Sequence, residues 1–216
     1  AKGPPHIAWP PPEEGSELDT ANSSSQPQKP NWAMWAAFAM IALGLLAFLY
    51  VVFAASSKPS VTGGLTRFAQ GELTKLVVVS DPPPMPLRPL QDAAGAEASL
   101  AAFKGQVTVL NVWFTGCAPC IHEMPSLAAL QRRYEGRINV VPVSIDGEAK
   151  RAEAVAMLAE LSENTLPFYI DISRGVAFDV GAPGFPITII YDRRGEEIAR
   201  LAGGADWASE DAFALI

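Results

Sequence analysis

The sequence predicts an α/β domain with a mixed β-sheet, preceded by a single helix that spans a membrane. One observation is a stretch of 24 residues without a charge, 32–55, followed by apolar strand segments that alternate with helical segments. Another is the pair Cys117 and Cys120, the only cysteines in the chain, which stand where a strand gives way to a helix. The 216 residues leave room for one domain of ordinary size and some additional chain.

The composition excludes several classes of protein. Hydrophobic residues make up 49% of the chain and charged residues only 18%, so a long uncharged segment is expected. The formal net charge of −7 argues against a nucleic-acid-binding protein, which needs a basic surface. Two cysteines are too few for a disulfide-stapled scaffold, a four-thiolate zinc site or an iron–sulfur cluster.

The first 55 residues predict a tail and an anchor. Residues 1–31 contain seven prolines and no periodic apolar pattern, which is typical of a disordered tail. The stretch 32–55 would form a helix about 36 Å long, enough to cross a hydrocarbon core of about 30 Å. A cleaved signal peptide and a buried core helix are the alternatives to a transmembrane helix. The few flanking Lys and Arg residues leave its orientation open.

Residues 56–89 are predicted to be an extended connector, and residues 90–216 to be the folded domain. The connector holds a short strand candidate, 76–79, and five prolines between residues 82 and 89, which favour an extended path with little backbone pairing. In the domain, the pattern predicts strands at 107–114, 139–145, 167–172, 187–192 and 196–201, and helices at 119–134, 148–161, 175–180 and 209–216. Such alternation is typical of a sheet with parallel pairs.

Cys117 stands at the predicted N-terminus of a helix. Pro119 supports that position, because proline is tolerated in the first helical turn. Unpaired N–H groups and the positive end of the helix dipole favour a thiolate there, which lowers the pKa of the Cys117 thiol and makes it a nucleophile. Cys120 is one turn further along, so the pair can close a disulfide and reopen it by thiol exchange. The sequence therefore predicts a redox-active centre.

Other uses of the two thiols fit the sequence less well. Zinc would need two more ligands, and the only histidines are His6 and His122. Covalent haem attachment would need histidine where Ile121 stands. A structural disulfide over so short a loop would add little stability. The alternative from another class is a protein that carries Cu(I) between the two thiolates for oxidase assembly, with His122 or Met124 as a strained third ligand. No cofactor is expected.

The stretch 111–125, NVWFTGCAPCIHEMP, resembles the active site of membrane-anchored thioredoxin-like proteins of the TlpA and ResA type. Their pattern is approximately N-F-W-A-x-W-C-x-P-C-x-x-E-x-P, and the stretch 184–192, GFPITIIYD, is similar to their cis-proline loop and the following strand. The resemblance implies a thioredoxin fold on the periplasmic side of a bacterial cytoplasmic membrane. It also implies reduction of disulfides in client proteins of cytochrome c or cytochrome oxidase maturation, with electrons from a membrane thiol transporter.

The resemblance assigns roles to further residues. Pro186 is expected to be cis and, with Phe185, to shape the edge on which a client segment docks, unless it is a plain strand-edge proline. Trp113 corresponds to the tryptophan beside the site in the family, and it fits a core aromatic equally well. Glu123, one turn after Cys120, is expected to accept a proton or to tune the thiols, and the alternative is an exposed surface glutamate.

Three positions qualify the resemblance. Asn111 stands where cytosolic thioredoxins carry a buried aspartate, and an amide cannot accept that proton, so Glu123 or a water is favoured as the acceptor. Gly116 stands where the family has tryptophan. Loss of that ring is expected to remove an apolar contact next to Cys117 and to make the loop more flexible. His122 is expected to be an exposed helix residue.

Overall fold

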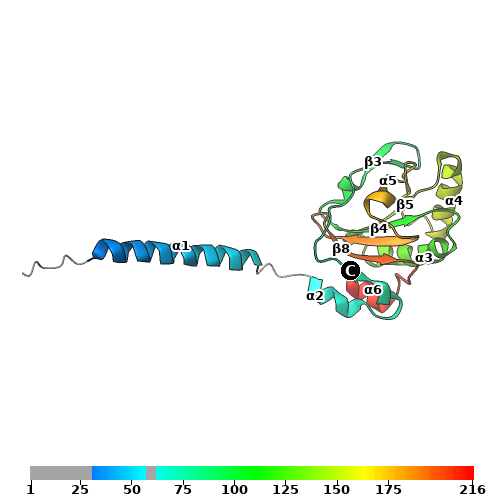
Figure 1. The fold of residues 1–216 in the computed structure, drawn as a ribbon. Coiled ribbons are helices and arrows are strands. Elements are labelled where there is room, and N and C mark those ends of the chain that lie inside the picture. The colour runs from blue at the N-terminus through cyan, green and yellow to red at the C-terminus, as the bar shows by residue number, and fades with distance from the viewer. Residues whose placement is uncertain (1–30, 57–61) are drawn as a thin grey trace, which may run out of the picture. The chain divides into compact units, whose positions relative to one another are not determined.

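The structure of the protein is a computed structural model that describes residues 31–56 and 62–216 (Figure 1). The chain divides into two compact units, Ala1–Lys58 and Pro59–Ile216. The tail predicted for residues 1–31 lies outside the described residues, apart from Asn31.

The first unit contains the helix α1, Trp32–Ser56. Within the described ranges, its segment Met34–Phe53 is the one helix long and apolar enough to cross a membrane, with a mean hydropathy of 2.5. Large apolar side chains such as Phe38 and Leu46 are exposed along it. A helix that is apolar on all sides and exposed is suited to lipid, so α1 is a candidate transmembrane helix, in agreement with the segment predicted from the sequence.

The second unit is built on an eight-stranded mixed sheet with the strand order β1-β8-β7-β4-β5-β6-β2-β3. Its strands are β1 (Val77–Val78), β2 (Pro89–Asp92), β3 (Glu97–Ser99), β4 (Val107–Trp113), β5 (Ile138–Ser144), β6 (Tyr169–Ile170), β7 (Ile187–Tyr191) and β8 (Glu197–Ala202). The central strand β4 pairs in parallel with β5 and antiparallel with β7. The hairpin expected after residue 191 joins β7 to β8, with Gly195 at φ 80° in its turn.

Helices cover both faces of this sheet (Figure 1). Residues of α3 (Ala118–Arg133), α4 (Arg151–Leu161) and α6 (Glu210–Leu215) pack in one core, and residues of α5 (Gly175–Asp179) pack in the other. The unit also contains the short helix α2 (Thr62–Leu65). Alternate residues of β4 enter two separate cores: Val109 packs in a cluster with α3 and α4, whereas Leu110 packs in a cluster with α5. Because β4 is buried on both faces, its sequence VTVLNVW is mostly apolar and does not alternate, and its polar residues Thr108 and Asn111 are buried too.

The folded unit extends into the segment predicted to be a connector, 56–89, and the strand candidate 76–79 is present there as β1, Val77–Val78. Leu73 and Met85 are buried in the two cores, and β1 pairs antiparallel with β8. The prolines lack N–H groups but keep their carbonyls, so Pro83 O accepts a hydrogen bond from Glu197 N at 3.0 Å. Met85, which stands between two prolines, donates its own N–H to Gly195 O at 2.8 Å. Backbone pairing at the sheet edge is therefore compatible with a proline-rich sequence.

The strands at the other edge also differ from the prediction. The hairpin of β2 and β3 was not expected, and the strand expected at 167–172 is reduced to the two residues of β6. The hairpin strands contain Pro, Asp, Glu and Ala, whose own strand propensity is low, whereas the two residues of β6 are Tyr and Ile, which favour strands. They are strands because each finds a neighbour to pair with: β2 pairs with β6, and β6 with β5.

Replacement of Leu110 by alanine is expected to lower the free energy of unfolding by about 2–5 kcal/mol, because the side chain is wholly buried and its loss leaves a cavity. The measurement is chemical unfolding of the full chain in detergent, monitored by near-ultraviolet circular dichroism. Leu87→Ala is the control, since Leu87 is 63% exposed and should change stability by about 0.5 kcal/mol or less. Equal losses in the two variants would contradict the assignment of this core.

Candidate active site

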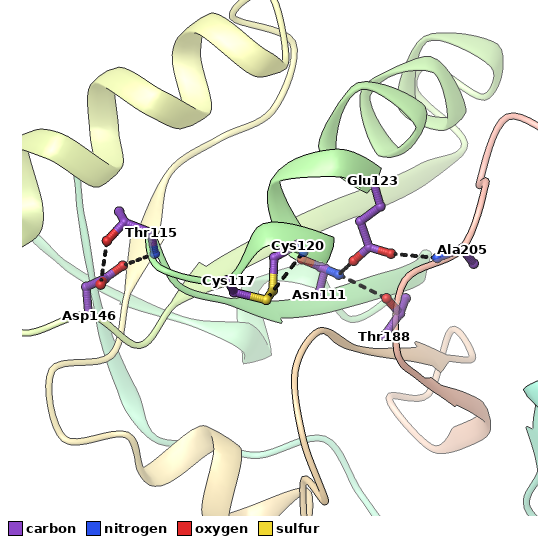
Figure 2. The surroundings of a disulfide bond; sticks show 8 residues. All are labelled: Asn111, Thr115, Cys117, Cys120, Glu123, Asp146, Thr188 and Ala205. Atoms are coloured by element: carbon purple, nitrogen blue, oxygen red, sulfur yellow. Dashed lines mark hydrogen bonds between the residues drawn. A yellow bond between two sulfur atoms is a disulfide. The ribbon is translucent and has the colours of Figure 1, made fainter.

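Cys117 and Cys120 form a disulfide at the N-terminus of α3, where the sequence predicted a redox pair (Figure 2). After β4 ends at Trp113, Cys117 N donates to Phe114 O at 3.1 Å and closes the turn into the helix. Cys117 is the N-cap residue, and its Sγ accepts a hydrogen bond from Cys120 N at 3.3 Å. This N–H group and the helix dipole are the features that stabilise a thiolate on Cys117 once the disulfide is reduced.

The two cysteines differ in exposure. Cys117 is 5% exposed, whereas Cys120 has no exposed surface and lies in the core beside Met124. An incoming disulfide can therefore meet only the first of the two. The second is placed to attack from inside, after a bond to Cys117 has formed.

Glu123 is a buried carboxylate, so the alternative of an exposed surface glutamate is wrong. It is 3% exposed, and its Oε1 accepts a hydrogen bond from Asn111 Nδ2 at 2.7 Å (Figure 2). Its Oε2 accepts from Ala205 N at 3.1 Å and from Trp207 Nε1 at 3.2 Å. Burial raises the pKa of Glu123 to about 7, and the three N–H donors oppose this rise because they favour the charged form. The group can thus gain or lose a proton near neutral pH.

Asn111 connects Glu123 to the sheet. Its Nδ2 also donates to Thr188 Oγ1 at 3.0 Å, on the neighbouring strand β7. Asn111 Oδ1 is buried and has no hydrogen-bond partner among the described residues. The amide therefore acts only as a donor here, and the carboxylate beside it is the group that can accept a proton.

Sequence reasoning missed the partners Ala205, Trp207 and Thr188. They lie 65 or more positions after Glu123 in the chain, in β7 and in the loop that follows β8. No local pattern marks them, since a backbone N–H, an indole and a hydroxyl at these places are common in any α/β domain. Only the pairing of β4, β7 and β8 brings them to the carboxylate.

A second buried carboxylate holds the loop before Cys117. Asp146 Oδ2 accepts from Thr115 N, and Asp146 Oδ1 accepts from Thr115 Oγ1, both at 2.9 Å (Figure 2). Ser144 Oγ also donates to Asp146, and Lys150 Nζ donates to Thr115 Oγ1 at 3.1 Å. The loop expected to be more flexible because of Gly116 is thus tied to the end of β5 two residues before Cys117.

The other residues singled out from the sequence, Trp113, Phe185, Pro186 and His122, differ from one another in burial. Trp113 has no exposed surface, so the structure corresponds to the core alternative and offers none of this ring to a client. The Phe185–Pro186 peptide bond is cis, as the resemblance implied. Pro186 is buried, whereas Phe185 is half-buried and its ring meets that of Phe114 edge to face, with centroids 5.8 Å apart. His122 is exposed on α3.

Among the residues that the structure describes, no group of three or more His, Cys, Asp or Glu side chains is placed to hold a metal ion. The Cu(I) alternative would thus have only the thiolates of Cys117 and Cys120 from these residue types. Met124, one of the two candidates for a third ligand, is packed in the core. His122 is exposed on the outer side of the helix.

Comparison with known proteins identifies the family. The profile of the AhpC/TSA family matches residues 83–198, which is more than half of the chain. The chain belongs to the AhpC/TSA family. It is 33% identical over 153 residues to the thiol-disulfide oxidoreductase ResA of Geobacillus kaustophilus, covering 69% of this chain and 80% of ResA. The resemblance to the TlpA and ResA type is therefore confirmed.

Two other relatives are similar to a smaller share of this chain. The thioredoxin-like protein YneN of Bacillus subtilis is 34% identical over 106 residues, and the thiol:disulfide interchange protein CycY of Rhizobium leguminosarum is 32% identical over 118 residues. These matches cover 49% and 52% of this chain. The chain spans 62% of the length of YneN and 61% of the length of CycY.

Solved structures show the same fold. A DsbF homologue from Corynebacterium diphtheriae superposes with a TM-score of 0.55 at 20% identity and covers 65% of this chain and 90% of its own. The thioredoxin domain of a thiol-disulfide oxidoreductase from Bacteroides vulgatus gives a TM-score of 0.52 at 22% identity, covering 63% and 94%. The fold is thioredoxin-like, as predicted.

The titration of Glu123 should make stability depend on pH. Because its pKa is raised from 4.5 to about 7, the folded protein keeps a proton that the unfolded chain releases, so the free energy of unfolding falls as pH rises through this window, by about 3 kcal/mol. Glu123→Gln should abolish this fall. The slope is diagnostic, since the amide of glutamine also faces N–H donors and lowers stability at every pH. Unfolding in urea between pH 4 and 8 measures it.

The exposed Glu153 on α4 provides the matched control for this titration. Glu153→Gln should keep the wild-type dependence of stability on pH. If Glu123→Gln also keeps it, the buried carboxylate is not the group that titrates.

Replacement of Asp146 by asparagine should weaken the tie to Thr115. The loss of charge-assisted hydrogen bonds is expected to cost about 1–3 kcal/mol of stability, and the loosened loop is expected to alter the apparent pKa of the reduced Cys117. Alkylation of the reduced protein with iodoacetamide as a function of pH measures this pKa.

Asp171 offers the comparison for Asp146, because it is equally buried and accepts hydrogen bonds from Ser173 N and Val176 N at the start of α5. Asp171→Asn should lower stability by a similar amount and leave the alkylation profile of Cys117 unchanged. A shift of equal size in both variants would mean that general loosening, and not the tie to Thr115, alters the thiol.

Proposed function

We propose that this protein is a membrane-anchored thiol:disulfide reductase that acts on disulfides of partner proteins. The observation that carries the proposal is the position of Cys117: its Sγ lies at the N-terminus of α3, accepts the N–H of Cys120, and belongs to the more exposed cysteine of the pair. The names of the relatives, thiol-disulfide oxidoreductase and thiol:disulfide interchange protein, support the same chemistry.

The reaction is two successive thiol–disulfide exchanges. The thiolate of Cys117 attacks one sulfur of the client disulfide, so a Cys117–client disulfide forms and the other client sulfur leaves as a thiolate. The thiolate of Cys120 then attacks Cys117 Sγ, and the second client sulfur leaves. The client gains two electrons and becomes a dithiol, while the protein dithiol is oxidised to the Cys117–Cys120 disulfide. The leaving thiolates take up the two protons that the cysteines release.

Glu123 is the proposed acceptor for the proton of Cys120. It lies one helical turn after Cys120 and titrates near neutral pH, so it can take a proton from the buried thiol and return it to a leaving thiolate or to water. Asn111 and Trp207 are positioning residues, because they hold the two carboxylate oxygens. A carboxylate without these donors would be costlier to ionise in the core.

The resemblance to the TlpA and ResA type supports a proposal for the location and the partners. We infer that α1 anchors the chain in a bacterial cytoplasmic membrane, with the thioredoxin-like unit in the periplasm. The clients would be maturation factors of cytochrome c or cytochrome oxidase that contain a disulfide. A membrane thiol transporter would return the Cys117–Cys120 disulfide to the dithiol.

Cys120→Ala should trap clients covalently on Cys117, since the mixed disulfide can no longer be resolved. Non-reducing gels of cells that express this variant should show adducts that reductant removes, and mass spectrometry of the adducts identifies the clients. Cys117→Ala is the matched control and should form none. Adducts on Cys117→Ala but not on Cys120→Ala would mean that the roles of the two sulfurs are reversed.

The direction of the reaction depends on the midpoint potential of the pair. A reductase requires a potential well below about −200 mV, whereas an oxidant of client thiols would lie above it. Equilibration of the full chain in detergent with dithiothreitol or glutathione buffers gives the value. A potential above this limit would mean that the protein is an oxidase or isomerase of the same fold and not a reductase.

A further inference from the structure

The two residues at positions 114 and 116 reverse the family pattern in size. The pattern N-F-W-A-x-W-C places alanine two residues before tryptophan, whereas this chain has Phe114 and Gly116, large first and small second. Both positions lie in the loop between β4 and Cys117. A large and a small residue have therefore changed places on the same side of the redox pair.

The structure shows that the ring of Phe114 takes the space next to Gly116. A Cβ atom built on Gly116 would lie 3.2 Å from Cε2 of Phe114, which is closer than most side chains approach, and 3.5 Å from Cδ2, which is an ordinary contact distance. Gly116 is not among the glycines of this chain with a positive φ, so its backbone does not itself require glycine. A side chain at position 116 would therefore require the ring of Phe114 to shift by a few tenths of an ångström.

The same ring reaches the cis-proline loop. Phe114 and Phe185 meet edge to face at 5.8 Å and an interplanar angle of 90°, and Phe185 directly precedes the cis bond to Pro186. Both rings are half-buried, so each keeps part of its surface open. Phe114 thus spans from the residue beside Cys117 to the residue beside Pro186.

We propose that Phe114 is a specificity-determining residue that replaces the missing tryptophan, and that its exposed edge contacts apolar side chains flanking the client disulfide. The inference rests on the proposed function, because it concerns the segment that Cys117 attacks. That segment must cross the surface next to Cys117 to bring a sulfur to the nucleophile. An apolar ring there favours clients with apolar side chains next to the disulfide, because contact buries the apolar surfaces of both partners.

The test compares two probes: a cyclic peptide with one disulfide whose cysteines are flanked by Phe and Leu, and the same peptide with Ser at those places. The full chain, in its reduced form and in detergent, reduces each peptide. The readout is the second-order rate constant for the apolar peptide divided by that for the Ser peptide. Phe114→Ala should lower this ratio by about tenfold, mainly through slower reduction of the apolar peptide. A ratio is insensitive to the fraction of protein that folds.

Restoring the family arrangement gives a second, independent arm. Gly116→Trp alone should lower the melting temperature, because the indole and the ring of Phe114 compete for one space. The double variant Phe114→Ala with Gly116→Trp should recover both the melting temperature and the preference for the apolar peptide. If the double variant has the same melting temperature and the same peptide preference as Gly116→Trp alone, Phe114 does not take the place of the family's tryptophan.

Phe103→Ala is the matched control, because Phe103 is also half-buried and meets Tyr169 edge to face at 5.8 Å. Neither residue belongs to the segments 111–125 and 184–192 that form the site. This variant should lose stability and keep the wild-type ratio. An unchanged ratio in Phe114→Ala, or an equal change in Phe103→Ala, would refute the specificity role while the reductase remains. If the wild type reduces neither peptide and Cys120→Ala traps no client, the proposed function fails and this inference fails with it.

Discussion

The site depends on one hydrogen bond at a chain reversal, from Cys120 N to Cys117 Sγ. The bond exists because β4 ends at Trp113 and α3 begins at Ala118, so Cys117 falls on the N-cap position, where backbone N–H groups lack partners within the helix. A sulfur at that place satisfies one of these donors. The interaction that completes the helix end is therefore the one that prepares the nucleophile.

Around this point the protein buries two carboxylates for different purposes. Asp146 accepts three hydrogen bonds and fixes the loop before Cys117. Glu123 accepts three bonds as well, yet burial raises its pKa to about 7. The difference suits their tasks: Asp146 holds a loop in place, whereas Glu123 can exchange a proton close to Cys120 in the chain.

Local patterns were sufficient for the central elements and insufficient at the sheet edges. The continuous apolar run of β4 and the start of α3 at Pro119 are properties of neighbouring residues, and the structure places both within one residue of the prediction. In the segment 71–85 the local pattern predicted only the strand candidate 76–79, because the prolines, Leu73 and Met85 gain their partners from β8 and the two cores. Its inclusion in the folded unit is a consequence of pairing across the sheet.

The sequence by itself determined the redox pair, the helix N-terminus beneath it and the candidate membrane helix, since each depends on residues close together in the chain. It also determined the fold class, from the alternation of strands and helices and from two motifs that resemble a known family. Only the tertiary structure decided that Glu123 is buried among Asn111, Ala205 and Trp207, and that the ring of Phe114 meets the ring of Phe185. Burial and ring contacts join segments distant in the chain, and no short stretch of sequence encodes which of them meet.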